Sequence, residues 1–153
     1  MSDKFRKKYR IPSSRLQSWD YSDNGYYFIT ICTKDREEYF GEIINNKINL
    51  TGIGLITSEY WLGISNHFPF VELDEFIVMP NHVHGIIIIR NVRRRDGACP
   101  VSTKRMNTLG NIVGSFKSAV TKYANSHQII FHWQSRYYER IIRNKKEYLC
   151  IKQ

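Results

Sequence analysis

The sequence has no apolar run long enough to cross a membrane and few cysteines. A spanning helix needs about 18 consecutive apolar residues, and the N-terminal segment 1–10 is basic with no hydrophobic stretch behind it. Cys32, Cys99 and Cys150 are odd in number, far apart and without Cys-x-x-Cys spacing. This pattern argues against a disulfide framework or a zinc knuckle and suits a reducing compartment. We therefore expect a cytoplasmic protein without a membrane partner.

Acidic residues are also in short supply. The 153 residues include 14 Asp and Glu against 23 Lys and Arg, which gives a net charge of +9. Such a charge favours a polyanionic partner, most of all a nucleic acid. The alternative is that the basic residues only increase solubility. Hydrophobic residues make up 42% of the chain, enough for one domain with a core. We expect that domain over 21–153, preceded by a basic N-terminal arm over 1–20.

The periodicity of apolar residues predicts an alternation of strands and helices. Thr51 and Asn144 are expected to cap helices, and Asn45-Asn46 to form the turn of a small hairpin. A positive loop is expected over 91–106. The order strand, helix, strand, strand, helix, strand predicts a ferredoxin-like α+β fold: an antiparallel sheet with two helices on one face, plus a C-terminal helix. The strands are expected at 26–33, 40–44, 47–50, 71–79, 82–89, 131–133 and 137–142, and the helices at 51–67, 107–125 and from 145.

A paired histidine opens the expected inner strand. Side chains two residues apart share one face of a strand, so His82 and His84 project together, ahead of four consecutive isoleucines. Two imidazoles on one face can bind one divalent ion. The alternative is that both face solvent or hydrogen-bond within the core. Burying an imidazole without a partner costs about 1–3 kcal/mol, which favours a metal site. Imidazole suits several metals, so the pair alone leaves the metal open.

Basic side chains on the later elements are candidates for phosphate contacts. Each of them also fits a solvated surface residue. Exposed aromatic residues among Trp133, Tyr137 and Tyr138 are candidates for stacking on unpaired bases, although Trp133 also fits the core. The candidate nucleic-acid-binding residues are Lys117, Lys122, Arg136, Arg140 and Arg143.

The chain contains, in this order, YYFITICT, Phe40-Gly41 with its hairpin, MPNHVHGIIII, LGNIVGSFKSAVTKYAN, Trp133-Gln134, Tyr137-Tyr138 and Ile142-Arg143-Asn144. This ordered set resembles the single-tyrosine transposases of the HUH endonuclease superfamily, most closely the REP-associated group related to insertion-sequence transposases. The resemblance runs from about Tyr26 to Gln153. Its HUH motif falls on His82, Val83 and His84.

The resemblance implies DNA strand transfer on single-stranded DNA that carries hairpins. It implies that His82 and His84 hold Mg²⁺ or Mn²⁺ and that a tyrosine on the final helix attacks the scissile phosphate, giving a 5′-phosphotyrosine link and a free 3′-hydroxyl. Symmetric dimers and monomers both occur among the relatives, so a homodimer stays open. Aligned on 142–144, the family's tyrosine and a further metal ligand fall just past Gln153, which implies a truncated C-terminal helix.

Tyr148 is the nearest substitute for that tyrosine. It lies six residues earlier, which on a helix is a rotation of about 240°, so we expect it to face away from the family's position. Three other functions therefore remain open. The first is a truncated or domesticated hairpin-DNA-binding protein without cleavage activity. The second is a small metallohydrolase that uses the histidines with Asp74 or Glu75, and the third is an RNA-binding module on the same fold.

Overall fold

The computed structural model describes residues 4–5, 8–9, 16–21, 23–90 and 108–153. In the expected basic arm, β1 (Lys4–Phe5) pairs with β2 (Lys8–Tyr9). Much of that arm and the whole of the expected positive loop, with Cys99, lie outside the described residues. No helix in the described ranges is long and apolar enough to span a membrane.

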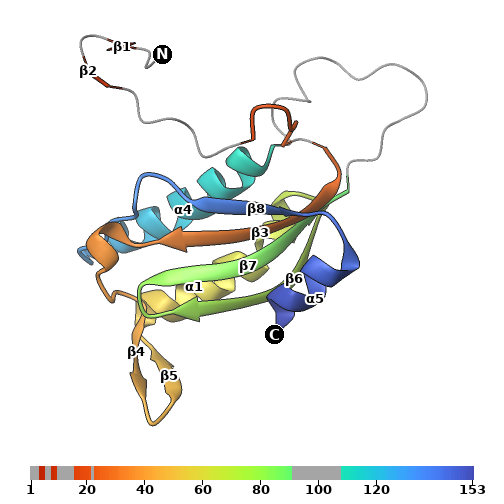
Figure 1. The fold of residues 1–153 in the computed structure, drawn as a ribbon. Coiled ribbons are helices and arrows are strands. Elements are labelled where there is room, and N and C mark those ends of the chain that lie inside the picture. Colours follow the sequence, from red (N-terminus) through yellow and green to blue (C-terminus); the bar gives the residue numbers. More distant parts are fainter. Residues whose placement is uncertain (1–3, 6–7, 10–15, 22, 91–107) are drawn as a thin grey trace.

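A four-stranded antiparallel sheet organises the domain (Figure 1). Its strands lie in the order β6 (Val71–Met79), β7 (His82–Ile89), β3 (Gly25–Cys32) and β8 (Tyr138–Ile142), so β7 is an inner strand as predicted. Two helices pack on one face and one helix on the other, which confirms the predicted ferredoxin-like α+β fold. The two are α1 (Gly52–Leu62) and α4 (Leu109–Ser126), and the third is α5 (Lys145–Lys152).

Smaller elements connect these layers. The predicted hairpin is present as β4 (Gly41–Ile44) and β5 (Lys47–Leu50), which project away from the sheet in Figure 1. The turn residues Asn45 and Asn46 have φ values of 50° and 60°, as a primed turn requires. A 3₁₀ turn, η1 (Lys34–Arg36), follows β3 and was not predicted. The expected strand over 131–133 is reduced to a single bridge between Trp133 and Thr33.

Both predicted caps are confirmed. The hydroxyl of Thr51 accepts a hydrogen bond from the Gly54 N–H at 3.2 Å, and the side-chain oxygen of Asn144 accepts one from the Glu147 N–H at 2.9 Å. Each satisfies a backbone donor that the first helical turn would otherwise leave unpaired. The helix predicted over 51–67 is interrupted at Gly63 and continues as α2 (Ile64–His67).

The main core lies between the sheet and α1 and α4, and Trp61 is at its centre. This side chain is fully buried, with ring centroids 5.9 Å from Phe76 and 5.3 Å from Phe116. A Cβ added at Gly85 would lie 2.2 Å from the Trp61 ring, so glycine makes room for the indole on β7. Ile53 and Ile64, expected on the apolar face of the first helix, are buried, whereas Ile56 and Tyr60, expected on the same face, are only half-buried.

The opposite face of the sheet carries a smaller cluster beneath α5. Ile86, Ile88 and Ile142 are buried there, and Tyr148 and Ile151 of α5 pack against them. Alternation along β7 puts both histidines on this same face, beyond the isoleucines that α5 covers. The C-terminal helix α5 therefore packs on the histidine-bearing face of the sheet.

Candidate metal and nucleic-acid site

The histidine rings lie side by side at the start of β7. The His82 and His84 centroids are 4.4 Å apart, with the ring planes at 74°. The register places His84 between Thr30 of β3 and Ile77 of β6, so the pair projects from the interior of the sheet. Both side chains are half-buried. Two imidazoles are therefore close together on a rigid strand, with one side still open to a ligand.

A neighbouring side chain engages one ring nitrogen of each histidine. The Thr30 hydroxyl lies 2.8 Å from Nδ1 of His84, and the side-chain oxygen of Asn81 lies 2.6 Å from Nδ1 of His82. Phe28 stacks on the His84 ring at 5.5 Å and 19°. In the tautomer with the proton on Nδ1, Nε2 of each ring has a free lone pair. Metal-binding histidines are commonly oriented in this way.

Burial keeps the imidazoles neutral. It lowers the pKa of His84 below the ordinary value of 6.5. It also lowers the pKa of His82, where the charges of His84 and Arg36 act in the same direction. An imidazole must be neutral to donate a lone pair to a metal. Both rings are therefore neutral at neutral pH, the form that a metal ligand requires.

The donor set fits Mg²⁺ or Mn²⁺ only if part of the coordination shell comes from elsewhere. Within the described ranges no group of three or more His, Cys, Asp or Glu side chains is placed to hold a metal. Asp74 and Glu75 instead form ion pairs with Lys152, each at 3.2 Å. Both ions favour oxygen ligands, so water and phosphate oxygens would complete the shell around two imidazoles.

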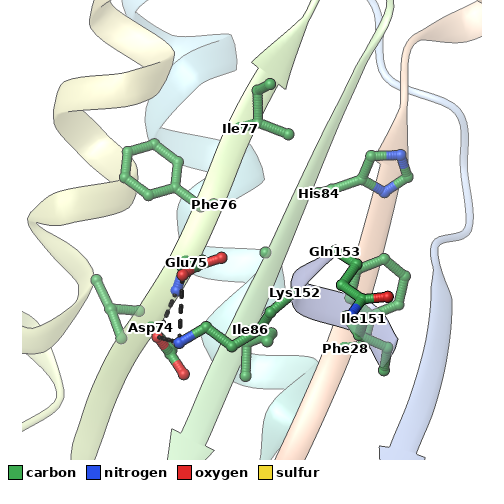
Figure 2. Close-up of a pocket in the computed structure, with 12 residues that line it drawn as sticks. Phe28, Asp74, Glu75, Phe76, Ile77, His84, Ile86, Ile151, Lys152 and Gln153 are labelled. Carbon is green, nitrogen blue, oxygen red and sulfur yellow. Dashed lines mark hydrogen bonds and ion pairs between the residues drawn. The ribbon is translucent and has the colours of Figure 1, made fainter. Parts of the chain in front are cut away.

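An open depression of 770 Å³ adjoins His84 (Figure 2). Phe28 and Ile77 line it from the sheet, and Lys152 and Gln153 line it from the end of α5. It is large enough for a nucleotide and has a mixed polar and apolar lining. The end of α5 therefore lies beside the candidate metal ligand.

Tyr148 is held away from the histidines. Its hydroxyl hydrogen-bonds to a carboxylate oxygen of Asp74, and the Lys152 ammonium donates to the same hydroxyl at 3.1 Å. Asp74 and Glu75 form a β-bulge, because together they occupy the span that Ile86 alone fills on β7. The bulge, Tyr148 and Lys152 thus fasten α5 to the edge of the sheet.

No family model matches the sequence. An uncharacterised protein from Haemophilus influenzae is 43% identical over 151 residues, and the match covers 91% of this chain and 82% of that protein. The chain belongs to the same family as that protein. A solved REP-associated tyrosine transposase bound to a REP hairpin matches with a TM-score of 0.54 and 19% identity, over 91% of this chain and 68% of the other. The fold is that of a REP-associated tyrosine transposase.

On this transposase fold the predicted cationic residues do not form one cluster. Lys117 is half-buried, burial lowers its pKa, and its ammonium donates to the Gln134 carbonyl at 2.7 Å. Arg140 lies opposite Phe28 on the histidine-bearing face and is 3.8 Å from Glu147. Lys122, Arg136 and Arg143 are exposed. The five residues thus belong to at least two separate surfaces.

Four residues near the histidines were missed from the sequence. Thr30 reaches His84 only through strand register, which local sequence does not reveal. Asn81 directly precedes His82, and its ability to accept a bond from the ring was a usable signal. Lys34 and Arg36 lie in the unpredicted turn η1. The Asn81 amide donates to the Arg36 carbonyl at 3.3 Å, which ties that turn to the histidine pair.

Proposed function

We propose that this protein is a transposase-like HUH protein that binds single-stranded DNA carrying hairpins, and cleaves and rejoins it through a 5′-phosphotyrosine intermediate with Mg²⁺ or Mn²⁺. The observation that carries the proposal is the pair of half-buried, neutral imidazoles with their Nδ1 atoms engaged. The shared fold with a REP-associated tyrosine transposase supports it.

In this proposal His82 and His84 would hold the metal through Nε2. Thr30 and Asn81 fix the two rings, so little orientational freedom is lost when a ligand binds. A bound divalent ion would supply Lewis-acid polarisation of the scissile phosphate. The depression next to His84 accepts the nucleotide on one side of that phosphate.

DNA affinity would come from cations and exposed aromatic rings. Tyr138 is 56% exposed and pairs with Thr30 on the histidine-bearing face. A DNA base next to the phosphate at the histidine pair can stack on this ring, and such stacking contributes about 1–3 kcal/mol to binding. Arg140, two residues along β8 on the same face, is placed to meet an adjacent phosphate.

A hairpin-DNA-binding protein without cleavage activity is a second candidate, and the position of Tyr148 favours it. The hydroxyl is bonded to Asp74 and Lys152 rather than directed at the histidines. A nucleophilic tyrosine must reach the phosphorus in line with the leaving oxygen. Tyr148 therefore does not take that role in the conformation observed.

The hydrolase alternative has less support. It needs Asp74 or Glu75 beside the histidines, whereas both carboxylates are paired with Lys152.

The RNA-binding alternative predicts preferential binding of ribo-oligonucleotides over DNA of the same sequence.

A denaturing gel of this chain with labelled, hairpin-bearing single-stranded DNA tests the proposal. The reaction is run with Mn²⁺ and with a chelator, beside a native gel that reports binding. The cleavage proposal predicts binding together with an adduct that depends on the metal and is lost in His82→Ala, which requires a tyrosine that reaches the phosphate. Binding without any adduct would favour the second candidate, and absence of binding would refute both.

A further inference from the structure

A groove runs from the turn Lys34–Arg36, past Trp133, to the surface of Lys117 and Lys122 on α4. Two open depressions of 500 and 480 Å³ meet at Trp133, which lines both of them. We call them together the Trp133 groove. The first is lined by Lys34, Asp35, Arg36, Trp133, Gln134 and Ser135, and the second by Lys117, Ser118, Thr121, Lys122, Asn125 and Trp133.

We propose that the Trp133 groove is a binding track for the phosphodiester backbone of single-stranded DNA, leading away from the histidine pair over the turn Lys34–Arg36. The inference rests on the proposed function and adds residues to its DNA-binding surface. Its partner is a polyanionic strand, because nearly all lining residues other than Trp133 are cationic, hydroxyl-bearing or amide-bearing.

Among the described residues, three cations of this groove have no carboxylate partner, unlike Arg90 and Lys152. The Arg90 guanidinium lies 2.9 Å from Glu72, and Lys152 lies 3.2 Å from Asp74. Across the described ranges the side chains of Lys34, Arg36 and Lys122 make no such ion pair. An unpaired cation is free to neutralise a phosphate without first breaking another contact.

The backbone of the turn supports a functional role. Asp35 and Arg36 have φ values of 54° and 57°, so two consecutive residues other than glycine are left-handed. Such residues cost about 1–2 kcal/mol each and persist where surrounding contacts impose them. The contacts here are the Lys34 N–H to the His132 carbonyl at 2.9 Å, and the Asn81 amide to the Arg36 carbonyl at 3.3 Å.

Asn81 gives the groove its connection to the histidines. Its amide donates to the Arg36 carbonyl at 3.3 Å, while its side-chain oxygen lies 2.6 Å from Nδ1 of His82. The Asn81 side chain thus restrains both the turn Lys34–Arg36 and the His82 ring. A strand with one phosphate at the histidine pair can therefore place a following phosphate at Arg36. From the histidine pair the DNA strand then contacts the turn Lys34–Arg36, next Trp133, and last the surface of Lys117 and Lys122.

Removing the charge of Asp35 and removing the charge of Arg36 should change DNA affinity in opposite directions. Asparagine tolerates the left-handed conformation well, so Arg36→Asn and Asp35→Asn both suit the backbone while removing one charge each. We expect Arg36→Asn to weaken hairpin-DNA binding several-fold and lower the salt slope of the affinity by about 0.7, as for one phosphate contact on a single strand. Asp35→Asn should bind more tightly than wild type, because it removes a negative charge from the track.

Fluorescence anisotropy with labelled hairpin-bearing single-stranded DNA, over a series of salt concentrations, measures these effects. Lys47→Gln is the matched control, because Lys47 is exposed on the projecting hairpin and lines neither depression. Wild type and Lys47→Gln should share one salt slope, and Arg36→Lys should keep most of the affinity. If wild type binds but Arg36→Asn and Lys47→Gln behave alike, the track is wrong and the proposed function stands. If wild type does not bind, the proposed function is overturned and the track with it.

Discussion

The Thr30 hydroxyl lies 2.8 Å from Nδ1 of His84, across the pairing of β3 with β7. This contact engages Nδ1 and restrains the orientation of the ring. We predict that Thr30→Val, which keeps the shape and removes the hydroxyl, weakens Mn²⁺ binding by about 10–100-fold. Thr30→Ser should bind like wild type.

Paramagnetic broadening of the histidine ring signals in a Mn²⁺ titration reports this effect directly. The rings of His67, His127 and His132 lie outside the site and serve as internal references. Equal broadening of the His84 signals in wild type and Thr30→Val would show that the hydroxyl has no orienting role.

Gly85 is required by the packing of Trp61. A Cβ at this position would lie 2.2 Å from the indole, so Gly85→Ala should lower the free energy of unfolding by about 1–3 kcal/mol. Gly114 in α4 is the matched control, because a Cβ there meets nothing within 4 Å. Gly114→Ala should raise stability by about 0.5–1 kcal/mol, since glycine is costly inside a helix. Urea denaturation measures the free energy of unfolding of each variant, which should fall in Gly85→Ala and rise in Gly114→Ala.

The bonds of the Tyr148 hydroxyl to Asp74 and Lys152 predict a role in the docking of α5 rather than in DNA binding. Tyr148→Phe removes its bonds to Asp74 and Lys152. We expect a loss of about 1 kcal/mol, which for a domain of this size is about 2–4 °C in Tm. Tyr138→Phe should leave Tm unchanged, because that ring is 56% exposed. A fall in hairpin-DNA affinity without a fall in Tm would place the Tyr148 hydroxyl at the DNA.

Asp74 makes the docking of α5 sensitive to acid. Burial raises the pKa of its carboxyl, but hydrogen bonds from Tyr148, Lys152 and the Glu75 N–H outweigh burial and hold the pKa below the ordinary 3.8. Because the folded state favours the ionised form, this stabilisation is complete above pH 3.8 and is lost as the pH falls through the lower folded pKa. The unfolding free energies of wild type and Asp74→Asn should therefore converge only in acid. A constant difference down to low pH would rule out the ionised carboxylate as the cause.

Much of the architecture follows from local patterns. The alternation in β6, the isoleucine run of β7 and the capping side chains of Thr51 and Asn144 each specify an element whose boundaries depend on near neighbours. The order of these elements, together with the tight turn at 80–81, leads to the observed sheet, because consecutive strands tend to pair and connections stay short.

Contacts between distant segments were not accessible from sequence. Trp61 is at the core centre because Gly85, on another element, leaves it room, and no helical pattern records that complementarity. The bond between Tyr148 and Asp74 depends on a bulge in β6 that alternation alone does not predict. Likewise the left-handed turn at Arg36 is imposed by Asn81, far along the chain. The histidine pair could be predicted and Asn81 beside it left a local signal, but Thr30 could not be predicted, because only strand register brings it to His84.

The most direct test of the histidine pair compares hairpin-DNA affinity with Mn²⁺ and with chelator, in wild type and in His82→Ala and His84→Ala. If the two imidazoles hold a divalent ion against a phosphate, Mn²⁺ should tighten binding by wild type and leave both variants at the affinity that wild type shows in chelator. An equal response to Mn²⁺ in all three proteins, or no response in wild type, would contradict a metal site at His82 and His84.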